Sequence, residues 1–188
     1  MGLKTLRDRF EESYTAVQVP ANNAKGFKIK YVYYAPWYIW DLPQRKLKKE
    51  KLLLFSLSII SLIFFFVAAT GITQSNYSAP VYISAILAFC AHIFELAALF
   101  QFAAAKYKVT KMTYGEIDRI MRLAPMVRAA CCSISGVVSV AYICLNGFSR
   151  PSSVVAAGYI ACAGIAGFMY GHYCKIPYRI EDNNASVY

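Results

Sequence analysis

His92 and Glu95 are two ionisable side chains near the middle of an apolar run that extends from Ala79 to Ala105. Their spacing of three residues places them on one face of a helix. Imidazole and carboxylate groups exchange protons at accessible pH, and a carboxylate near the middle of a bilayer costs at least about 3 kcal/mol unless it is neutral, paired or hydrated. We therefore expect this pair to face the interior of a helical bundle rather than lipid.

Four interpretations of the pair stay open at the level of sequence. Glu95 is either a structural group, hydrogen-bonded to His92 and to Ser or Tyr side chains of neighbouring helices, or the partner of Arg128, whose long side chain enters the third apolar run from the same side. In a third interpretation the pair relays protons, and in a fourth it supplies metal ligands together with His172. His172 lies at one end of the fourth run, which disfavours a shared site. We predict no metal and no cofactor.

The pair lies in the second of four apolar runs, and the helices that these runs predict must position it. Of the 188 residues, 58% are hydrophobic and only 16% are charged, which is too apolar for a typical soluble domain. Each run reaches the roughly 20 residues that cross a hydrocarbon core as a helix. The sequence predicts an all-α integral membrane protein, a four-transmembrane-helix bundle with spans at about Leu52–Ile72, Ala79–Ala105, Leu123–Asn146 and Ser153–Tyr173.

The positive charges are distributed unevenly along the chain. Eleven of the twenty Lys and Arg residues lie in residues 1–51 and six lie in residues 106–128, whereas the connections at 73–78 and 147–152 hold only Arg150. Loops rich in Lys and Arg remain in the cytoplasm. This pattern predicts an N-in/C-in protein in the cell membrane, and it attributes the net charge of +10 to topology and anionic lipid rather than to nucleic acid.

The residues before the first span are expected to lie at the cytoplasmic membrane surface. An amphipathic stripe over 3–14 predicts a short helix, and the β-prone segments 14–19 and 27–34 predict a small β-hairpin. A lone hairpin is marginal in water, so it needs support from the membrane, from the segment Lys175–Ile180 or from a partner.

Aromatic and basic side chains follow the hairpin. Trp and Tyr favour the headgroup region, and a basic cluster before a span attracts anionic lipid at about 1 kcal/mol per cation. Docking of another protein is the alternative for the aromatic set. The predicted interfacial anchors are Trp37, Tyr38 and Trp40, and the predicted contacts of anionic lipid headgroups are Arg45, Lys46, Lys48, Lys49 and Lys51.

The third and fourth spans are rich in small residues, which let helix backbones approach closely. We expect these two helices to pack tightly, and the sequence leaves open whether the fourth also faces a second copy of the chain or another membrane protein. The small residues form two ladders, Cys131, Ser135 and Ser139 in the third span and Ala163, Gly167 and Gly171 in the fourth.

The sequence holds no motif of a hydrolase, a nucleotide-binding enzyme or a zinc protease, so no catalytic residue is predicted. We expect three regions, a cytoplasmic surface region at 1–51, the transmembrane domain at 52–173 and a cytoplasmic tail at 174–188. The leading hypothesis is a non-enzymatic accessory or scaffold subunit of a membrane complex. A small proton-linked transporter or channel that uses His92 and Glu95 is the alternative, and a membrane enzyme is a third hypothesis without motif support.

Overall fold

The computed structural model describes residues 6–22 and 26–183, and 70% of it is helical. Two compact units divide the chain. One, the strand unit, comprises Met1–Asp41, Lys106–Glu116 and Tyr178–Tyr188, and the other, the helical unit, comprises Leu42–Ala105 and Ile117–Pro177. Each unit is therefore assembled from segments that lie far apart in the sequence.

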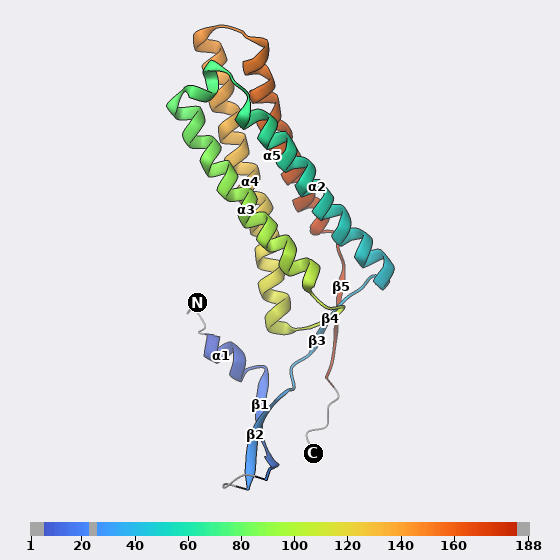
Figure 1. Cartoon of the computed structure of the whole chain (residues 1–188). Coiled ribbons are helices and arrows are strands. Elements are labelled where there is room, and N and C mark those ends of the chain that lie inside the picture. The colour runs from blue at the N-terminus through green and yellow to red at the C-terminus, as the bar shows by residue number, and fades with distance from the viewer. Residues whose placement is uncertain (1–5, 23–25, 184–188) are drawn as a thin grey trace. The chain divides into compact units, whose positions relative to one another are not determined.

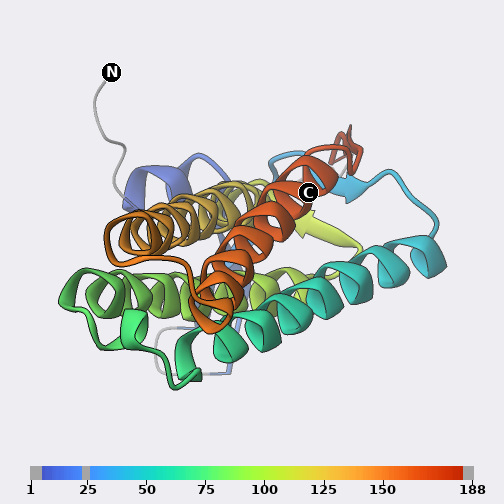
Figure 2. The ribbon, with the colours of Figure 1, turned by 90° about the horizontal axis from the view of Figure 1, so that it is seen from above.

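Four long helices form the bundle of the helical unit, and they run side by side in Figure 1 and Figure 2. All four are long and apolar enough to cross a membrane, as predicted from the lengths of the apolar runs. Two of them begin well before the predicted spans, since polar residues extend their first turns. The helices are α2 (Gln44–Thr70), α3 (Ala79–Ala104), α4 (Lys111–Asn146) and α5 (Arg150–Tyr173).

The α4 helix continues through Pro125. Proline removes one backbone donor and clashes with the preceding turn, which usually bends or ends a helix. In α4 the helical assignment is unbroken from Lys111 to Asn146. The helix that carries Arg128 therefore begins twelve residues before the predicted third span, which starts at Leu123.

The core of the helical unit brings α2 and α5 close together. Phe65 and Ala68 of α2 pack with Tyr159 and Cys162 of α5 in one buried cluster. Close approach requires a glycine there, because a Cβ atom built on Gly158 would lie 2.8 Å from the Cβ of Ala68. The connection between α2 and α3 contains a short 3-10 helix, η1 (Gln74–Tyr77).

The strand unit begins with the helix α1 (Leu6–Glu11) and a β-hairpin. Part of the predicted amphipathic helix, residues 3–5, lies outside the described residues. The predicted helix also extends too far at its C-terminal end, because α1 ends at Glu11 and Tyr14 already belongs to a strand. Strands β1 (Tyr14–Pro20) and β2 (Phe27–Tyr33) pair antiparallel, so the predicted hairpin forms.

A second sheet of three strands was not predicted. Its central strand β3 (Trp37–Trp40) pairs antiparallel with β4 (Lys108–Thr110) on one side and with β5 (Tyr178–Glu181) on the other. The C-terminal segment considered as a support for the hairpin thus pairs with β3 instead. The sheet joins the segments that precede α2, that connect α3 to α4 and that follow α5.

Candidate functional site

Glu95 of α3 and Arg128 of α4 form an ion pair inside the bundle. Arg128 Nε lies 2.8 Å from Glu95 Oε2, and both residues have 0% exposure. The N–H of Arg128 is not aligned for a hydrogen bond, so the contact is a short charge pair without one. Arg128 Nη2 also lies 3.3 Å from the Sδ of Met169 on α5. The two charges neutralise each other away from solvent.

His92 lies one turn before Glu95 and is also fully buried. Its Nδ1 lies 2.9 Å from the carbonyl oxygen of Ala88, and its Nε2 lies 3.4 Å from the hydroxyl of Ser61 on α2. Because a carbonyl only accepts, Nδ1 carries the hydrogen, and in a neutral ring Nε2 then accepts from Ser61. The imidazole of His92 therefore connects α3 to α2.

Further polar side chains surround these three, and together they make the polar cluster of the bundle. The thiol of Cys162 donates to the carbonyl oxygen of Ser61 at 3.2 Å, and Cys132 lies beside Cys162. The hydroxyls of Ser58 and Tyr159 are also buried, and Ser58 lies beside Glu95. All four helices contribute to the cluster, which comprises Ser58, Ser61, His92, Glu95, Arg128, Cys132, Tyr159 and Cys162.

The polar cluster contains imidazole, carboxylate and thiol groups, which are types of metal ligand, but the described residues do not arrange them as a metal site. Within residues 6–22 and 26–183, no group of three or more His, Cys, Asp or Glu side chains is arranged to bind a metal ion. His172 is not part of the cluster, because its Nε2 lies 2.6 Å from Glu50 Oε2 of α2. The metal interpretation thus has no third ligand in the part of the chain that the structure describes.

The predicted interfacial anchors lie in the central strand of the three-stranded sheet. Trp40 is only 2% exposed and packs on Tyr114. Tyr38 stacks on Tyr114 and on Tyr178, and these two rings also contact each other. Trp37 is half-buried against Tyr33. A ring that is enclosed by protein has little surface left for lipid, so the burial of Trp40 weighs against its role as an anchor.

The predicted lipid-contacting cations separate into two groups. Arg45, Lys46, Lys48 and Lys49 are exposed in the first turns of α2, which has no acidic residue in its first turn. Cations at a helix N-terminus oppose the helix dipole, so an anion bound there would relieve the repulsion. Lys51 differs because its ammonium donates to the carbonyl oxygens of Ala105 and Ala103 at 2.6 and 3.3 Å.

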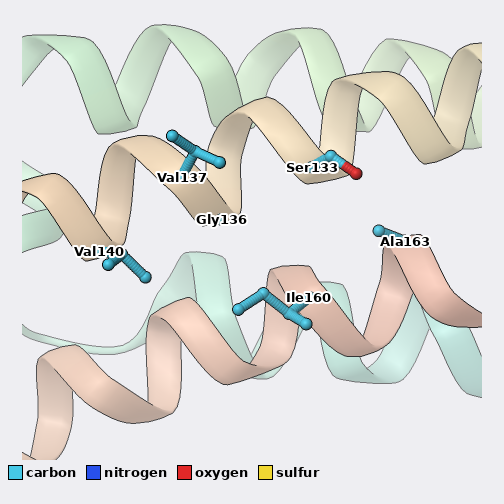
Figure 3. A pocket seen from close by; sticks show the side chains of 6 residues that line it. All are labelled: Ser133, Gly136, Val137, Val140, Ile160 and Ala163. Atoms are coloured by element: carbon cyan, nitrogen blue, oxygen red, sulfur yellow. The ribbon is translucent and has the colours of Figure 1, made fainter.

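A shallow apolar groove of about 300 Å³ lies between α4 and α5 (Figure 3). Gly136, Val137 and Val140 line one side, and Ile160 and Ala163 line the other. The expected tight packing of the third and fourth spans is wrong over most of their length, because α5 packs chiefly on α2. Helices α4 and α5 approach closely only at one point, where a Cβ atom on Gly136 would lie 3.0 Å from the side chain of Ile160. The glycines of the predicted ladder on α5, Gly167 and Gly171, have no side chain or neighbouring backbone within 4 Å of an added Cβ.

Two features of the helical unit were not found from the sequence. The contact between Glu50 and His172 joins residues 122 positions apart. The Lys51 cap, in which the ammonium donates to Ala105 O at the end of α3, joins residues 54 positions apart. The sequence holds one hint of these contacts. Both members of each pair lie near helix ends that the predicted topology places on the same side. Many charged residues lie near these helix ends, and the packing of the helices decides which of them contact one another.

The fold and the cluster define a class, a helical protein with four helices long enough to span a membrane and a charge pair enclosed between them. Comparison with protein-family models, with curated proteins and with solved structures finds no match.

Proposed function

We propose that this chain is an integral protein of the cell membrane whose N-terminus, central loop and C-terminus lie in the cytoplasm. The uneven distribution of Lys and Arg supports this topology. The three-stranded sheet supports it independently, because strands on either side of the helical pairs α2–α3 and α4–α5 belong to one sheet. If the four helices cross the membrane, strands that share a sheet lie on one side of it.

Within that membrane the protein acts as a non-enzymatic accessory or scaffold subunit. The enclosure of the Glu95–Arg128 pair carries this proposal, because the two charges neutralise each other inside the bundle at 0% exposure. Such a pair specifies how α3 and α4 fit together, which is a structural use of charge. The strand unit then offers the surfaces for other molecules, with exposed apolar side chains such as Ile29, Tyr34 and Ile180.

Photo-crosslinking in native membranes tests this function. A photoreactive residue at Tyr34 or Ile180 in the strand unit should give the same discrete protein adduct, identified by mass spectrometry from both positions. The matched control is Ile63, which is 58% exposed on α2 and should give lipid adducts. A monodisperse monomer in mild detergent, together with no common protein adduct from the two strand positions, would contradict the scaffold function.

A small proton-linked transporter is the second candidate, and one observation favours it. The buried hydroxyls of Ser58 and Tyr159 lie in the same cluster as His92 and Glu95, and Ser58 lies beside the carboxylate of Glu95. Ionisable side chains enclosed inside a membrane protein, such as His and Glu, are typical of proton pathways. In liposomes, Glu95→Gln and His92→Gln should then abolish pH-driven flux, whereas Glu50→Gln should not. Unchanged flux in both cluster variants, or no flux in the unmodified protein, would exclude this candidate.

A further inference from the structure

The hydrogen-bond register of the hairpin shows which backbone groups point outward. Tyr34 N–H donates to Ser13 O at 3.1 Å, and Ala21 N–H donates to Gly26 O at 3.1 Å. These bonds lie at opposite ends of the hairpin and belong to the same antiparallel register. Hydrogen-bonded and non-hydrogen-bonded pairs alternate along such a ladder. The even-numbered residues of β2 therefore direct their N–H and C=O groups toward β1. The N–H and C=O groups of Ile29 and Tyr31 therefore point away from β1.

The two outer edges of the hairpin differ. On β1 the outward positions include Pro20, which has no N–H and is a residue that blocks strand addition. On β2 the described residues include no strand paired with the outer edge. Its outward carbonyl at Tyr33 already accepts a hydrogen bond from the Asn183 side chain at 2.7 Å. The edge is thus able to receive polar groups from another segment.

The side chains of β2 define the partner. Lys28 and Lys30 are exposed on one face, and Ile29 and Tyr31 are 52% and 58% exposed on the other. A second copy of β2 added to this edge would bring lysines opposite lysines, which is unfavourable. An added strand with acidic residues on the lysine face and apolar residues on the other face complements both faces.

We propose that the outer edge of β2 binds an extended segment of a partner protein in which acidic and apolar residues alternate. The added strand would receive hydrogen bonds from the outward N–H groups of Ile29 and Tyr31. Its carboxylates would lie next to Lys28 and Lys30. This inference rests on the proposed scaffold function, because it names the class of partner that the strand unit would hold.

Hydrogen exchange on the full-length protein in neutral-lipid nanodiscs tests the edge directly. The probe is a short synthetic peptide of alternating glutamate and valine, and the control probe replaces glutamate by lysine. The glutamate peptide should slow exchange of the outward amides of Ile29 and Tyr31 by about tenfold or more, because they gain acceptors. The inward amide of Lys30, already bonded to β1, should change little.

Matched variants separate edge pairing from simple charge attraction. Ile29→Pro removes an outward N–H from β2, and Gln18→Pro removes one at the paired position on the outer edge of β1. Only the first should weaken binding of the glutamate peptide in fluorescence anisotropy. The double variant Lys28→Glu/Lys30→Glu leaves the backbone intact, and it should weaken that binding about tenfold and favour the lysine peptide.

Three results would overturn the proposal. One is the absence of both peptide binding and amide protection, and another is equal binding of the two peptides by the unmodified protein. The third is protection of the β2 amides by phosphatidylserine in the disc instead of by peptide, since the lysines would then serve lipid headgroups. A common crosslinked partner from Tyr34 and Ile180 would still support the scaffold function in each case, so the two proposals fail separately.

Discussion

Breaking the Glu95–Arg128 pair leaves a charge in an apolar interior. A buried ion pair adds little net stability compared with well-packed apolar residues, because both charges lose their hydration. Removal of one partner is different, since the remaining ion has neither water nor a counter-charge. The energetic role of the pair is therefore visible only when single and double replacements are compared.

Glu95→Gln should lower the free energy of unfolding by about 3–5 kcal/mol, because the guanidinium of Arg128 becomes an unpaired buried charge. The double variant Glu95→Leu/Arg128→Met should recover most of that loss. Reversible unfolding in mixed micelles measures both, with the exposed Glu116→Gln as control. A double variant that is less stable than Glu95→Gln would show that the pair itself supplies the stability.

Lys51→Met should cost about 1 kcal/mol of stability, because the carbonyl oxygens at the end of α3 lose their cationic donor. The neighbouring Lys49→Met, which removes an exposed cation, should change stability by less than about 0.5 kcal/mol. The same micelle unfolding assay compares the two. Equal effects of the two replacements would assign the loss to general charge reduction instead of to the cap.

The stability of the strand unit should fall as the pH rises above about 10, through Tyr33. Burial raises the pKa of Tyr33 above its ordinary value of 10.0, while its hydroxyl donates to Pro36 O and accepts from Lys111 N–H. A raised pKa means that the folded protein holds the proton more tightly, so this contribution is complete at lower pH and is lost on deprotonation. Thermal unfolding of the unmodified protein should decline more steeply above this pH than that of Tyr33→Phe, and parallel profiles would contradict the assignment.

Sequence reasoning at the scale of residues works where the cost of placing a charge in apolar surroundings decides which way a side chain faces. A carboxylate in a long apolar run is expected to face inward, and Arg128 was considered as its partner from the sequence; the structure pairs the two. The partners of Lys51, Glu50 and His172 depend on how helix ends meet across more than fifty residues, and no local pattern encodes that.

At the scale of elements, the close approach of α2 and α5 is the most specific packing feature of the helical unit. It depends on Gly158, where an added Cβ would also lie 3.3 Å from the carbonyl oxygen of Phe64. A backbone oxygen and a small buried side chain have little room to move. The two helices would have to separate to accept a larger residue.

Gly158→Ala should destabilise the protein by about 1–3 kcal/mol through overpacking. Gly164 and Gly167 on the same helix have open space around them, so Gly→Ala there should be neutral or slightly stabilising. Thermal unfolding of the three variants in one detergent makes the comparison. If the replacement at Gly164 or Gly167 is as costly as that at Gly158, those glycines are in contact with a second copy or a partner.

The long helices were predictable as elements, because hydrophobic length is a strong signal. The three-stranded sheet was not. Its strand β4 has only three residues, Lys108–Thr110, and its strand β3 has a continuous run of aromatic and aliphatic residues in place of the alternation that marks a strand. Pairing between distant segments, rather than local preference, makes these residues strands.

At the scale of the whole molecule, the proposed topology predicts opposite labelling of two exposed sites. Phe148→Cys lies in the connection between α4 and α5, and Ile180→Cys lies in β5. A membrane-impermeant maleimide should modify the first on intact cells and the second only after the membrane is opened. The unmodified protein, with its six native cysteines, gives the background. The reverse pattern would invert the topology, and labelling of both sites on intact cells would exclude it.

The sheet β4–β3–β5 also has a consequence for biogenesis. During translation β3 leaves the ribosome first, β4 follows after two helices and β5 follows only after all four. The aromatic strand Trp37–Trp40 therefore keeps one edge open until α5 and residue 178 have been synthesised. Completion of the sheet reports that the last helix is in place, so a nascent chain stalled before residue 178 would present an exposed strand edge to chaperones and proteases.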